Sequence, residues 1–440
     1  MPGVSERTSE FRTEARALDA ADPLRAMRAE FHIPRAPGAE KRDCVYMVGN
    51  SLGLMPRAAR AAVDQELDDW ARMGAEGHFK PRDNWYRYHE LVREPLARLV
   101  GALPHEVVAM NSLTVNLHAM LVSFYRPEMR PGGRRAILID TPCFPSDLYA
   151  VKSHLRLHGV AESEGLIRLS PRAGEQALRT EDVLDALAKR RNELALVLLA
   201  GLNFVTGQAP DIARITKAAR DAGCAVGWDL AHAIGNIPLA MHDSGADFAV
   251  WCSYKYLNSG PGAVAGCFIH ERHTLKSSPE HRRALPRLEG WWGNDPDSRF
   301  RMADEFVPVA SADAWQLSNP PIFSLAPLKT SLALFERAGV SALRAKSIRL
   351  TGFLEHVLDS TTKRLGGKLS ILTPRDPESR GCQLSLQVPG DARALVDRLA
   401  REGVLCDARE PNVIRLAPVP LYNSFEDCVL AVEAFERSLQ

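Results

Sequence analysis

Two apolar runs that each end on ionisable residues constrain the fold of this chain more than any other feature. The first, residues 225–228, reads Ala-Val-Gly-Trp and stops at Asp229, with His232 three positions later. The second, residues 247–252, leads into Lys255, which has a tyrosine on either side. Short apolar runs of this kind predict strands that are buried on both faces of a sheet. Ligands of open α/β sheets bind at the carboxyl ends of the strands, so both ionisable ends are expected at one site.

A lysine and a carboxylate at neighbouring strand ends are the two groups that pyridoxal phosphate requires. We expect Lys255 to form a Schiff base with the cofactor and Asp229 to keep the pyridine nitrogen protonated, so that the ring acts as an electron sink. The turn at residues 258–262 reads Asn-Ser-Gly-Pro-Gly, and its small residues let the backbone approach a ligand closely. Lys255 or Asp229 alone would more often be a structural or solvated residue. The combination of the two predicts the cofactor.

Composition and charge exclude several other classes of protein. The chain has 440 residues, 45% hydrophobic and 25% charged, which suits a globular protein with one large and one smaller domain. The formal net charge of +1 argues against a nucleic-acid partner held by bulk electrostatics. No apolar run is long enough to span a bilayer, and residues 1–24 lack the apolar core of a signal peptide. The eight cysteines include no C-x-x-C pair, so we expect reduced thiols, a cytoplasmic location and no metal site.

Strand and helix patterns alternate through the first part of the chain. Strands are expected at residues 135–140, 194–199 and 225–229, with helices at residues 115–125, 148–157 and 211–222. This alternation predicts an α/β fold with a mostly parallel, doubly wound sheet. A loop region rich in Gly, Asp and Pro follows at residues 290–321, and the helices and strands after it fit a smaller α+β domain. We therefore expect an N-terminal segment (1–45) packed with the small domain, a large cofactor-binding domain (46–320) and a small C-terminal domain (321–440).

The motifs of the chain resemble those of the kynureninases, which are fold-type I pyridoxal phosphate enzymes of tryptophan catabolism. The matching segments, in family order, are residues 49–53 (GNSLG), 111–116 (NSLTVN), 144–147 (FPSD), 206–208 (TGQ), 228–232 (WDLAH), 254–258 (YKYLN), 290–293 (GWWG), 318–321 (SNPP) and 414–420 (IRLAPVP). A generic aminotransferase would share only the portion from Asp229 to Lys255. The resemblance therefore implies the fold-type I architecture and this particular family.

The resemblance implies that Lys255 carries the cofactor and shuttles protons, and that Asp229 pairs with the pyridine nitrogen. Tyr254 is expected to be an acid or base beside the cofactor, because a phenol near a phosphate can relay protons. One position departs from the family, which often has Ser or Thr as a cofactor contact shortly before the TGQ segment. This chain has Ala200 there, so that hydroxyl contact is missing.

Two further segments are implied to hold the cofactor. Phe144 would stack on the ring with Asp147 near its edge, although Phe144 could instead be a core residue. The backbone of Leu113 and Thr114, at a helix N-terminus, would bind the phosphate, because unpaired N–H groups there favour an anion. The whole implied cofactor-binding set is Leu113, Thr114, Phe144, Pro145, Ser146, Asp147, Asp229, His232, Tyr254, Lys255, Trp291 and Asn319.

A second implied set binds the substrate. It consists of Ser51, His78, Trp292, Asn319 and Arg415. Arg415 would hold the α-carboxylate of the substrate in a bidentate fork, and the alternative is a buried structural salt bridge. Trp291 and Asn319 would come from the partner subunit, so the resemblance implies a homodimer with shared active sites. Trp291 could instead be structural.

The resemblance also implies the reaction. This is hydrolysis of L-kynurenine or 3-hydroxy-L-kynurenine to an anthranilate and L-alanine, a step of the kynurenine pathway that leads to NAD biosynthesis. Family members that prefer kynurenine have Trp and Thr at two positions of the substrate pocket, whereas those that prefer the 3-hydroxy form have His and Asn. The chain has His78 and Asn319, so we expect preference for the 3-hydroxy form. His78 as a surface loop residue is the alternative.

Two related activities would share the fold and Lys255. A class-V aminotransferase would exchange its amino group with a keto acid and would not need the loop of Trp291 and Asn319. A cysteine desulfurase would need a mobile catalytic cysteine, and the loops of this chain offer no clear one. A homologue without enzymatic activity would not need Lys255, Asp229 and Arg415 together.

Overall fold

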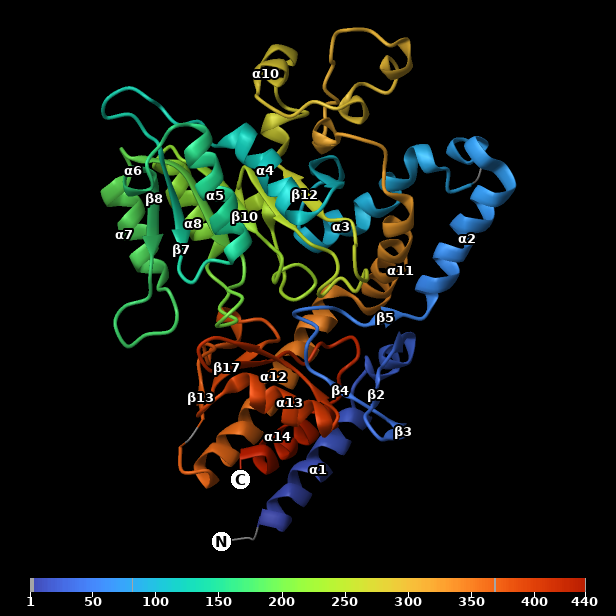
Figure 1. Cartoon of the computed structure of the whole chain (residues 1–440), viewed down its shortest axis with the longest axis vertical. Helices are drawn as coiled ribbons and strands as arrows, with labels where there is room; N and C mark the ends of the chain where they lie inside the picture. The colour runs from blue at the N-terminus through green and yellow to red at the C-terminus, as the bar shows by residue number, and fades with distance from the viewer. Residues whose placement is uncertain (1–3, 81, 368, 440) are drawn as a thin grey trace.

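A seven-stranded sheet forms the centre of the larger lobe of the molecule (Figure 1). The computed structural model describes residues 4–80, 82–367 and 369–439. In sheet order the strands are β6 (Val107–Ala109), β12 (Gly266–Ile269), β11 (Phe248–Trp251), β10 (Ala225–Asp229), β9 (Leu194–Ala200), β7 (Ala136–Asp140) and β8 (Leu166–Leu169). Only β12 runs antiparallel to its neighbours within this sheet. The predicted mostly parallel α/β sheet is therefore confirmed.

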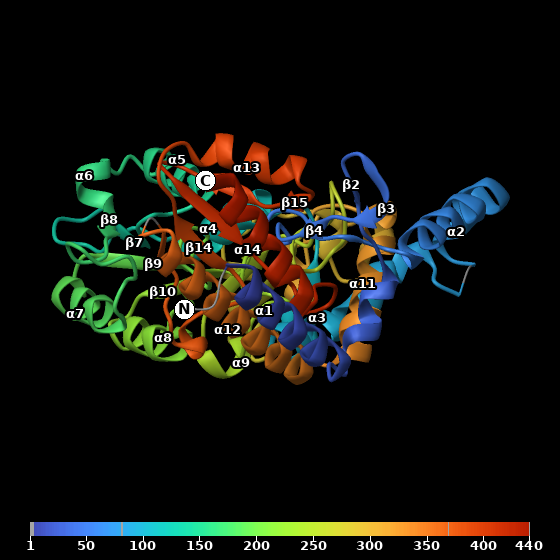
Figure 2. The same cartoon turned by 90° about the horizontal axis from the view of Figure 1, so that it is seen from below.

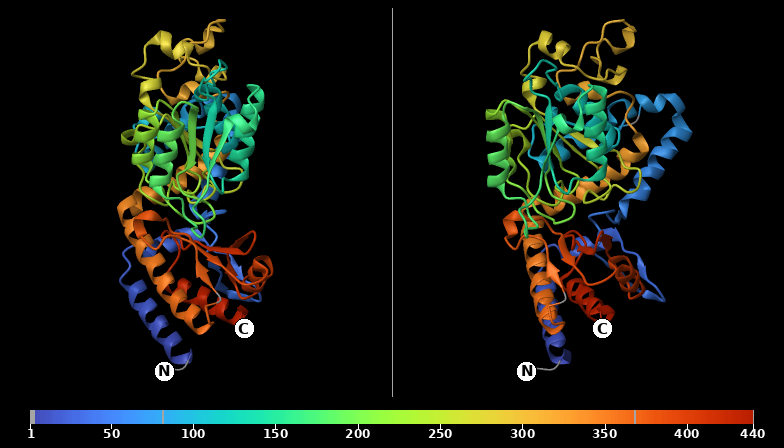
Figure 3. Two further views of the ribbon diagram at one scale, coloured as in Figure 1. Left: turned by 90° about the vertical axis from the view of Figure 1, so that its left-hand side faces the viewer. Right: turned by 60° about the vertical axis from the view of Figure 1, so that its left-hand side comes forward.

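Helices cover both faces of this sheet (Figure 3). On one face lie α4 (Leu113–Phe124) and α5 (Pro145–Leu157), whose apolar side chains pack with Ile137 and Ile139 of β7. On the other lie α7 (Thr180–Arg190) and α8 (Ile212–Asp221), which share a core with Leu138 of the same strand. Successive strand residues point to opposite faces, so an unbroken apolar strand is buried on both sides.

A four-stranded antiparallel sheet forms the smaller lobe. Its strands are β13 (Ser370–Ile371), β14 (Leu384–Gln387), β17 (Val413–Leu416) and β16 (Asp407–Arg409). Four helices pack with it, namely α12 (Val340–Arg364), α13 (Ala392–Arg401), α14 (Phe425–Leu439) and the N-terminal α1 (Val4–Ala20). Figure 2 views the molecule from this side and shows α1 beside α14, where Arg12 forms a bidentate pair with Glu433. The strands β4 (Val45–Tyr46) and β15 (Val404–Leu405) pair in parallel and tie the N-terminal segment to this lobe.

The two hydrophobic cores meet near the start of α12. Helix α11 (Ile322–Ala338) follows the expected domain boundary at residue 321, yet Leu325, Leu328 and Leu332 join the core of the large lobe. There α11 packs against α2 (Ala58–Met73). The small-lobe core includes α12 only from Leu350 onward. Packing therefore places α11 with the large lobe, because its apolar face is covered by that lobe.

The remaining elements are short connections and edges. They are β1 (Phe31–His32), β2 (Arg35–Ala36), β3 (Ala39–Asp43), β5 (Met55–Pro56), α3 (Arg93–Val100), α6 (Glu162–Gly165), α9 (Met241–Ser244), α10 (Pro279–Ala284), and the 3₁₀ turns η1 (Arg25–Glu30), η2 (Gly74–His78), η3 (Trp85–Val92), η4 (Pro104–Glu106), η5 (Glu271–His273), η6 (Trp291–Gly293), η7 (Arg299–Arg301), η8 (Ala312–Trp315) and η9 (Pro377–Ser379). In the described parts of the chain, no helix has the length and apolar character needed to cross a bilayer.

The carboxyl ends of the parallel strands face the small lobe. The loop after β9 reaches it through a bridge between Gln208 and Arg380, and the amide of Gln383 donates to the carbonyl of Phe204 at 3.2 Å. Next to β10, the Asn236 side chain accepts a hydrogen bond from the Cys382 N–H at 2.8 Å. The segment that contains α10, η6 and η7 lies at the opposite end of the large lobe in Figures 1 and 3. Strand ends and small lobe therefore enclose one region, and the α10–η7 segment lies away from it.

Candidate active site

The buried amine of Lys255 is held by an imidazole. Lys255 follows β11 and is 8% exposed, and its Nζ lies 3.0 Å from Nε2 of His232. Burial, and then the charges of Lys255 and Arg415, lower the pKa of His232 well below its usual range. The neutral ring therefore accepts a hydrogen bond from the lysine through Nε2 and carries its proton on Nδ1. That Nδ1 is buried and has no hydrogen-bond partner in the described chain, so it is available to a ligand.

Three carboxyl groups converge beside this amine. Asp229 ends β10, and its Oδ1 accepts a hydrogen bond from the Ala231 N–H at 2.7 Å. Burial and the neighbouring Asp229 raise the pKa of Asp147 well above its usual range. Burial also raises the pKa of Asp140, at the end of β7, to about 6, although Asn203 donates to its Oδ2 at 3.3 Å. Like charges in a desolvated site resist joint ionisation, which favours the protonated form of Asp147.

A cavity opens between these groups. Its lining comes from the ends of β7, β9 and β10, the loop after β11 and the starts of α4 and α5. The lining residues are Leu113, Thr114, Asp140, Phe144, Ser146, Asp147, Ala200, Leu202, Phe204, Asp229, Ala231, His232, Tyr254 and Lys255. The structure thus brings together all the single-chain cofactor residues expected from the sequence except Pro145, which is the first residue of α5.

One end of the cavity is suited to an anion. Helix α4 begins there, and the side chain of its N-cap residue, Ser112, accepts no backbone hydrogen bond. The first N–H groups of a helix have no intrahelical acceptor, so this end presents free donors and the positive end of the helix dipole. The hydroxyls of Thr114 and Ser146 lie 2.7 Å apart and join α4 to α5 at this point. A phosphate group fits these donors.

Another part of the cavity lining is aromatic. The Phe144 ring is 39% exposed, packs edge-on against Phe204 at 5.2 Å and lies 5.5 Å from Nζ of Lys255. Burial and the nearby Cys252 raise the pKa of Tyr254, so its phenol stays protonated at neutral pH. A flat ring, an amine, a carboxylate and an anion site therefore surround one space, and these residues fit pyridoxal phosphate.

Several residues expected at the site lie elsewhere in this chain. Trp291 donates from Nε1 to the Asn319 side chain at 3.1 Å, and its ring contacts Trp292. The Trp292 ring in turn packs against the Tyr86 ring, with ring centroids 5.2 Å apart. His78 lies on the neighbouring turn η2. This aromatic group includes η6, so it lies away from the Lys255 cavity of the same chain. Its exposed members include Phe79 (63%), Phe300 (56%) and Trp291 (44%).

Arg415 is fully buried and already has a carboxylate partner. It lies on β17, and its guanidinium forms a two-pronged pair with Asp407 of β16, with Nε 2.7 Å from Oδ1. Its Nη1 donates to the carbonyl of Phe204 at 2.7 Å, and the Phe204 side chain lines the cavity. With its amide rotated, Asn50 also accepts from Arg415, at 3.1 Å. Ser51, next to Asn50, is exposed and is not part of the cavity lining.

Several cavity residues were not expected from the sequence, among them Asp140 and Phe204. Asp140 ends an apolar strand in the same way as Asp229, so the same signal could have identified it. Phe204 lies in a loop without a distinguishing pattern, and its position depends on contact with the small lobe. Tertiary packing alone brings it to Phe144.

Comparisons with known proteins identify the family. A kynureninase from Myxococcus xanthus strain DK1622 is 54% identical over 422 residues, which cover 96% of each chain. This chain belongs to the kynureninase family. Kynureninases from Koribacter versatilis (50% identity, 96% of each chain) and Salinispora tropica (51%, 97% of each chain) are similar over a comparable length. A model described as the kynureninase C-terminal domain matches residues 343–435, and one described as class-V aminotransferase matches residues 45–280.

Solved structures agree with the fold expected for a kynureninase. A cysteine desulfurase from Escherichia coli has a TM-score of 0.73 over 94% of this chain and 98% of its own, at 18% identity. A C-DES mutant with glycine covalently linked to its pyridoxal phosphate cofactor has a TM-score of 0.72, covering 93% and 98%, also at 18% identity. At such identity the likeness shows the fold alone, which is fold-type I. The kynureninase relationship shows a pyridoxal phosphate enzyme of the hydrolase class that cleaves carbon–carbon bonds.

Proposed function

We propose that this kynureninase hydrolyses 3-hydroxy-L-kynurenine, and less efficiently L-kynurenine, to the corresponding anthranilate and L-alanine. The observation that carries the proposal is the buried Lys255 amine beside the strand-end carboxylate of Asp229, within a cavity that has an anion site at one end. Family membership supplies the reaction class. Purified protein mixed with L-kynurenine should generate anthranilate fluorescence, and a preparation that releases none would contradict the proposal.

The residues of the cavity divide the chemical tasks among them. Bound pyridoxal phosphate supplies an electron sink for negative charge that develops on the substrate carbons. Asp229, at the end of β10, would face the pyridine nitrogen. Thr114 and Ser146, with the free N–H groups of α4, would hold the phosphate. Phe144 would cover one face of the ring.

Proton transfer would belong to Lys255 and Tyr254. Lys255 is the basic group in the cavity that can take and return the substrate α-proton, and neutral His232 would hold the amine in position. Tyr254 keeps its phenolic proton at neutral pH, so it would donate to a carbanion when the Cβ–Cγ bond breaks. A water molecule would add to the γ-carbonyl before this bond breaks, so that the acyl group leaves as the anthranilate carboxylate.

Arg415 would bind the α-carboxylate of the substrate. Its contact with Phe204 places the guanidinium behind the cavity wall, and its bidentate geometry toward Asp407 is the geometry that a substrate carboxylate requires. Binding in this way requires Arg415 either to contact Asp407 and the substrate carboxylate together or to exchange Asp407 for the substrate carboxylate. The alternative is that Arg415 only joins β16 and β17, and the two interpretations differ in the effect of Arg415→Ala on the Michaelis constant.

The substrate ring would be recognised across a homodimer interface. His78, Trp292 and Asn319 lie around exposed aromatic side chains away from the Lys255 cavity of their own chain, which supports their use in the site of a second copy. Ser51 is proposed as a further substrate contact. An imidazole and an amide that pair with the ring hydroxyl would leave unpaired polar groups when it is absent, which favours the 3-hydroxy substrate.

The thiols of the chain support a reducing compartment. All eight cysteines are free, and all but Cys143 are buried. Disulfides are rare where cellular reductants keep thiols reduced. We place the enzyme in the cytoplasm on this basis, where the kynurenine pathway would supply its substrate.

A further inference from the structure

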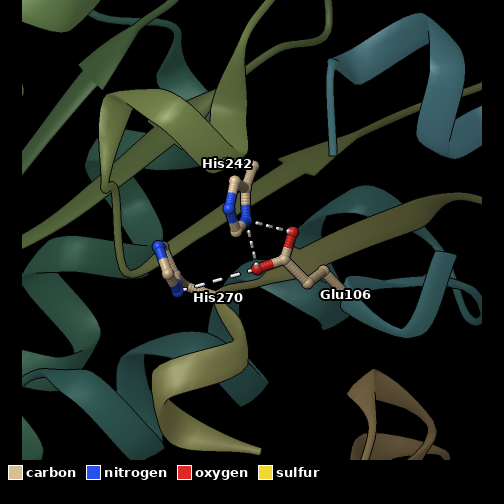
Figure 4. Close-up of side chains that lie close together, drawn as sticks. All are labelled: Glu106, His242 and His270. Carbon is tan, nitrogen blue, oxygen red and sulfur yellow. Dashed lines mark hydrogen bonds and ion pairs between the residues drawn. The ribbon is translucent and has the colours of Figure 1, made fainter. Parts of the chain in front are cut away.

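A second cluster of ionisable side chains lies outside the active site. Glu106 ends η4, directly before β6, His242 belongs to α9, and His270 follows β12 (Figure 4). In the antiparallel pair of β11 and β12, Ile269 lies opposite Phe248, the first residue of β11. The cluster is therefore at the amino edge of the parallel strands, opposite the edge that carries Lys255.

The spacing of the three side chains matches that of metal ligands. Nδ1 of His242 lies 3.1 Å from each carboxylate oxygen of Glu106, and Nδ1 of His270 lies 3.6 Å from Oε1. One ligand atom from each residue fits within 4.8 Å of the others. Tetrahedral Zn²⁺ with bonds of about 2.0–2.1 Å places its ligands roughly 3.3–3.4 Å apart. The cluster needs only small side-chain adjustments to enclose such an ion.

The charge of the cluster also favours a cation. Glu106 is fully buried, and within the described chain its only ion-pair partners are the two histidines. Nδ1 of His270 accepts a hydrogen bond from the Arg272 N–H, so this nitrogen holds a lone pair rather than a proton. Arg272 itself pairs with Asp247. A buried carboxylate that has no Arg or Lys partner in the described chain lacks full compensation, which a divalent cation would supply.

The carboxylate is already oriented by backbone groups. The Glu271 N–H donates to Oε1 of Glu106 at 2.8 Å, and the Leu103 N–H donates to Oε2 at 2.9 Å. Such outer contacts fix the direction of a metal-binding carboxylate. Nδ1 of His270 accepts from the Arg272 N–H at 3.2 Å, and a metal bond would replace that contact. The side chain of His242 is 30% exposed, which leaves an entry path and a position for water.

We propose that Glu106, His242 and His270 form a binding site for Zn²⁺ or a similar divalent transition metal. Two imidazoles and one carboxylate are a known ligand set for zinc, with a fourth position open to water. The ion would join the entry to β6, helix α9 and the exit from β12, so its role is to stabilise the large lobe. The sequence predicted no metal site, because Glu106 and His242 are 136 positions apart and have no local spacing signal.

Zinc binding by the cofactor-loaded enzyme tests this site. The enzyme is dialysed against a chelator and then equilibrated with micromolar Zn²⁺ in the absence of substrate, and bound metal is counted by elemental analysis. The variants are His242→Gln and the double variant His242→Gln, His270→Gln, because an amide side chain can still form a hydrogen bond with Glu106. The matched control is His281→Gln, which removes an exposed histidine of α10.

Wild type and His281→Gln should each bind about one Zn²⁺ more per chain than the double variant, and Zn²⁺ should raise Tm only in those two proteins. Kynurenine turnover should be the same in all of them. Equal zinc content in wild type and the double variant would overturn the proposal, as would the absence of saturable zinc in the wild type. If the double variant does not fold, the comparison of His242→Gln with wild type decides the question. Wild-type zinc affinity in His242→Gln would exclude the site.

Discussion

The Nζ atom of Lys255 lies 3.0 Å from Nε2 of His232 at the carboxyl edge of the central sheet. Because the imidazole is neutral, it accepts from the amine and leaves an N–H on its other nitrogen that no described residue accepts. The pair therefore orients the amine without competing for a proton. The reactivity of the cavity should accordingly depend on both residues, the lysine for the chemistry and the histidine for its position.

Lys255→Ala should abolish turnover and the visible absorbance of lysine-bound cofactor. No other described lysine lines the cavity, so no amine can replace it. Borohydride reduction followed by peptide mapping should place the cofactor on Lys255 in wild type and nowhere in the variant. A variant that is still labelled at one site and still active would exclude this assignment.

His232→Phe should keep the cofactor but slow the reaction. Loss of the acceptor leaves a buried donor unpaired, which costs about 1–3 kcal/mol, or a factor of roughly 5–150 in kcat/KM. His118→Phe is the matched control, because His118 of α4 pairs with His154 of α5 at 3.1 Å rather than with Lys255. Equal kinetics for wild type and His232→Phe would show that the amine does not need this partner.

Arg415→Ala should lower kcat/KM by about one to three orders of magnitude while cofactor absorbance persists. Arg380→Ala is the control, because Arg380 is equally buried in the small lobe and forms an ion pair with Glu355 at 2.6 Å. Loss of either buried pair should reduce Tm, but only Arg415→Ala should raise KM. If both variants lose stability and neither changes KM, Arg415 is structural.

Asp140→Asn should stabilise the protein at neutral pH. Burial raises the pKa of Asp140 to about 6, so the unfolded chain releases this proton first as pH rises from about 4. The resulting penalty is complete above about pH 6 and absent below about pH 4, and it amounts to at most about 3 kcal/mol. At saturating cofactor the variant should therefore exceed wild type in Tm at pH 7 and lose that advantage toward pH 4. A Tm difference that does not vary with pH would contradict this.

The sequence was most informative where chemistry follows directly from a strand. Asp229 and Lys255 could be placed because an uninterrupted apolar strand fixes where its next polar residue emerges. The pairing of Arg415 with Asp407 was open, since antiparallel register between β16 and β17 decides which side chains meet. The membership of α11 in the large lobe was missed for a similar reason. Its apolar face suits either core, and only contact with α2 determines which one covers it.

Residues that are proposed to act across a subunit interface are harder to place. The motifs at Trp291 and Asn319 were recognisable, but the structure of one chain shows them bonded to each other rather than near Lys255. Mixing two inactive variants tests their proposed role. Lys255→Ala and Asn319→Ala, dissociated and reassociated together, should recover up to about a quarter of wild-type activity, because half of the dimers would have one intact site. No recovery despite proven exchange would contradict shared sites.

The most direct test of the account is product analysis with 3-hydroxy-L-kynurenine and L-kynurenine, side by side, on the purified cofactor-loaded enzyme. We predict equimolar L-alanine and the matching anthranilate from both, without any keto acid, and a higher kcat/KM for the 3-hydroxy substrate. Exchanging His78→Trp and Asn319→Thr together should shift that preference toward L-kynurenine. Absence of anthranilate and alanine, with amino-group exchange that depends on an added keto acid, would contradict the proposed hydrolysis.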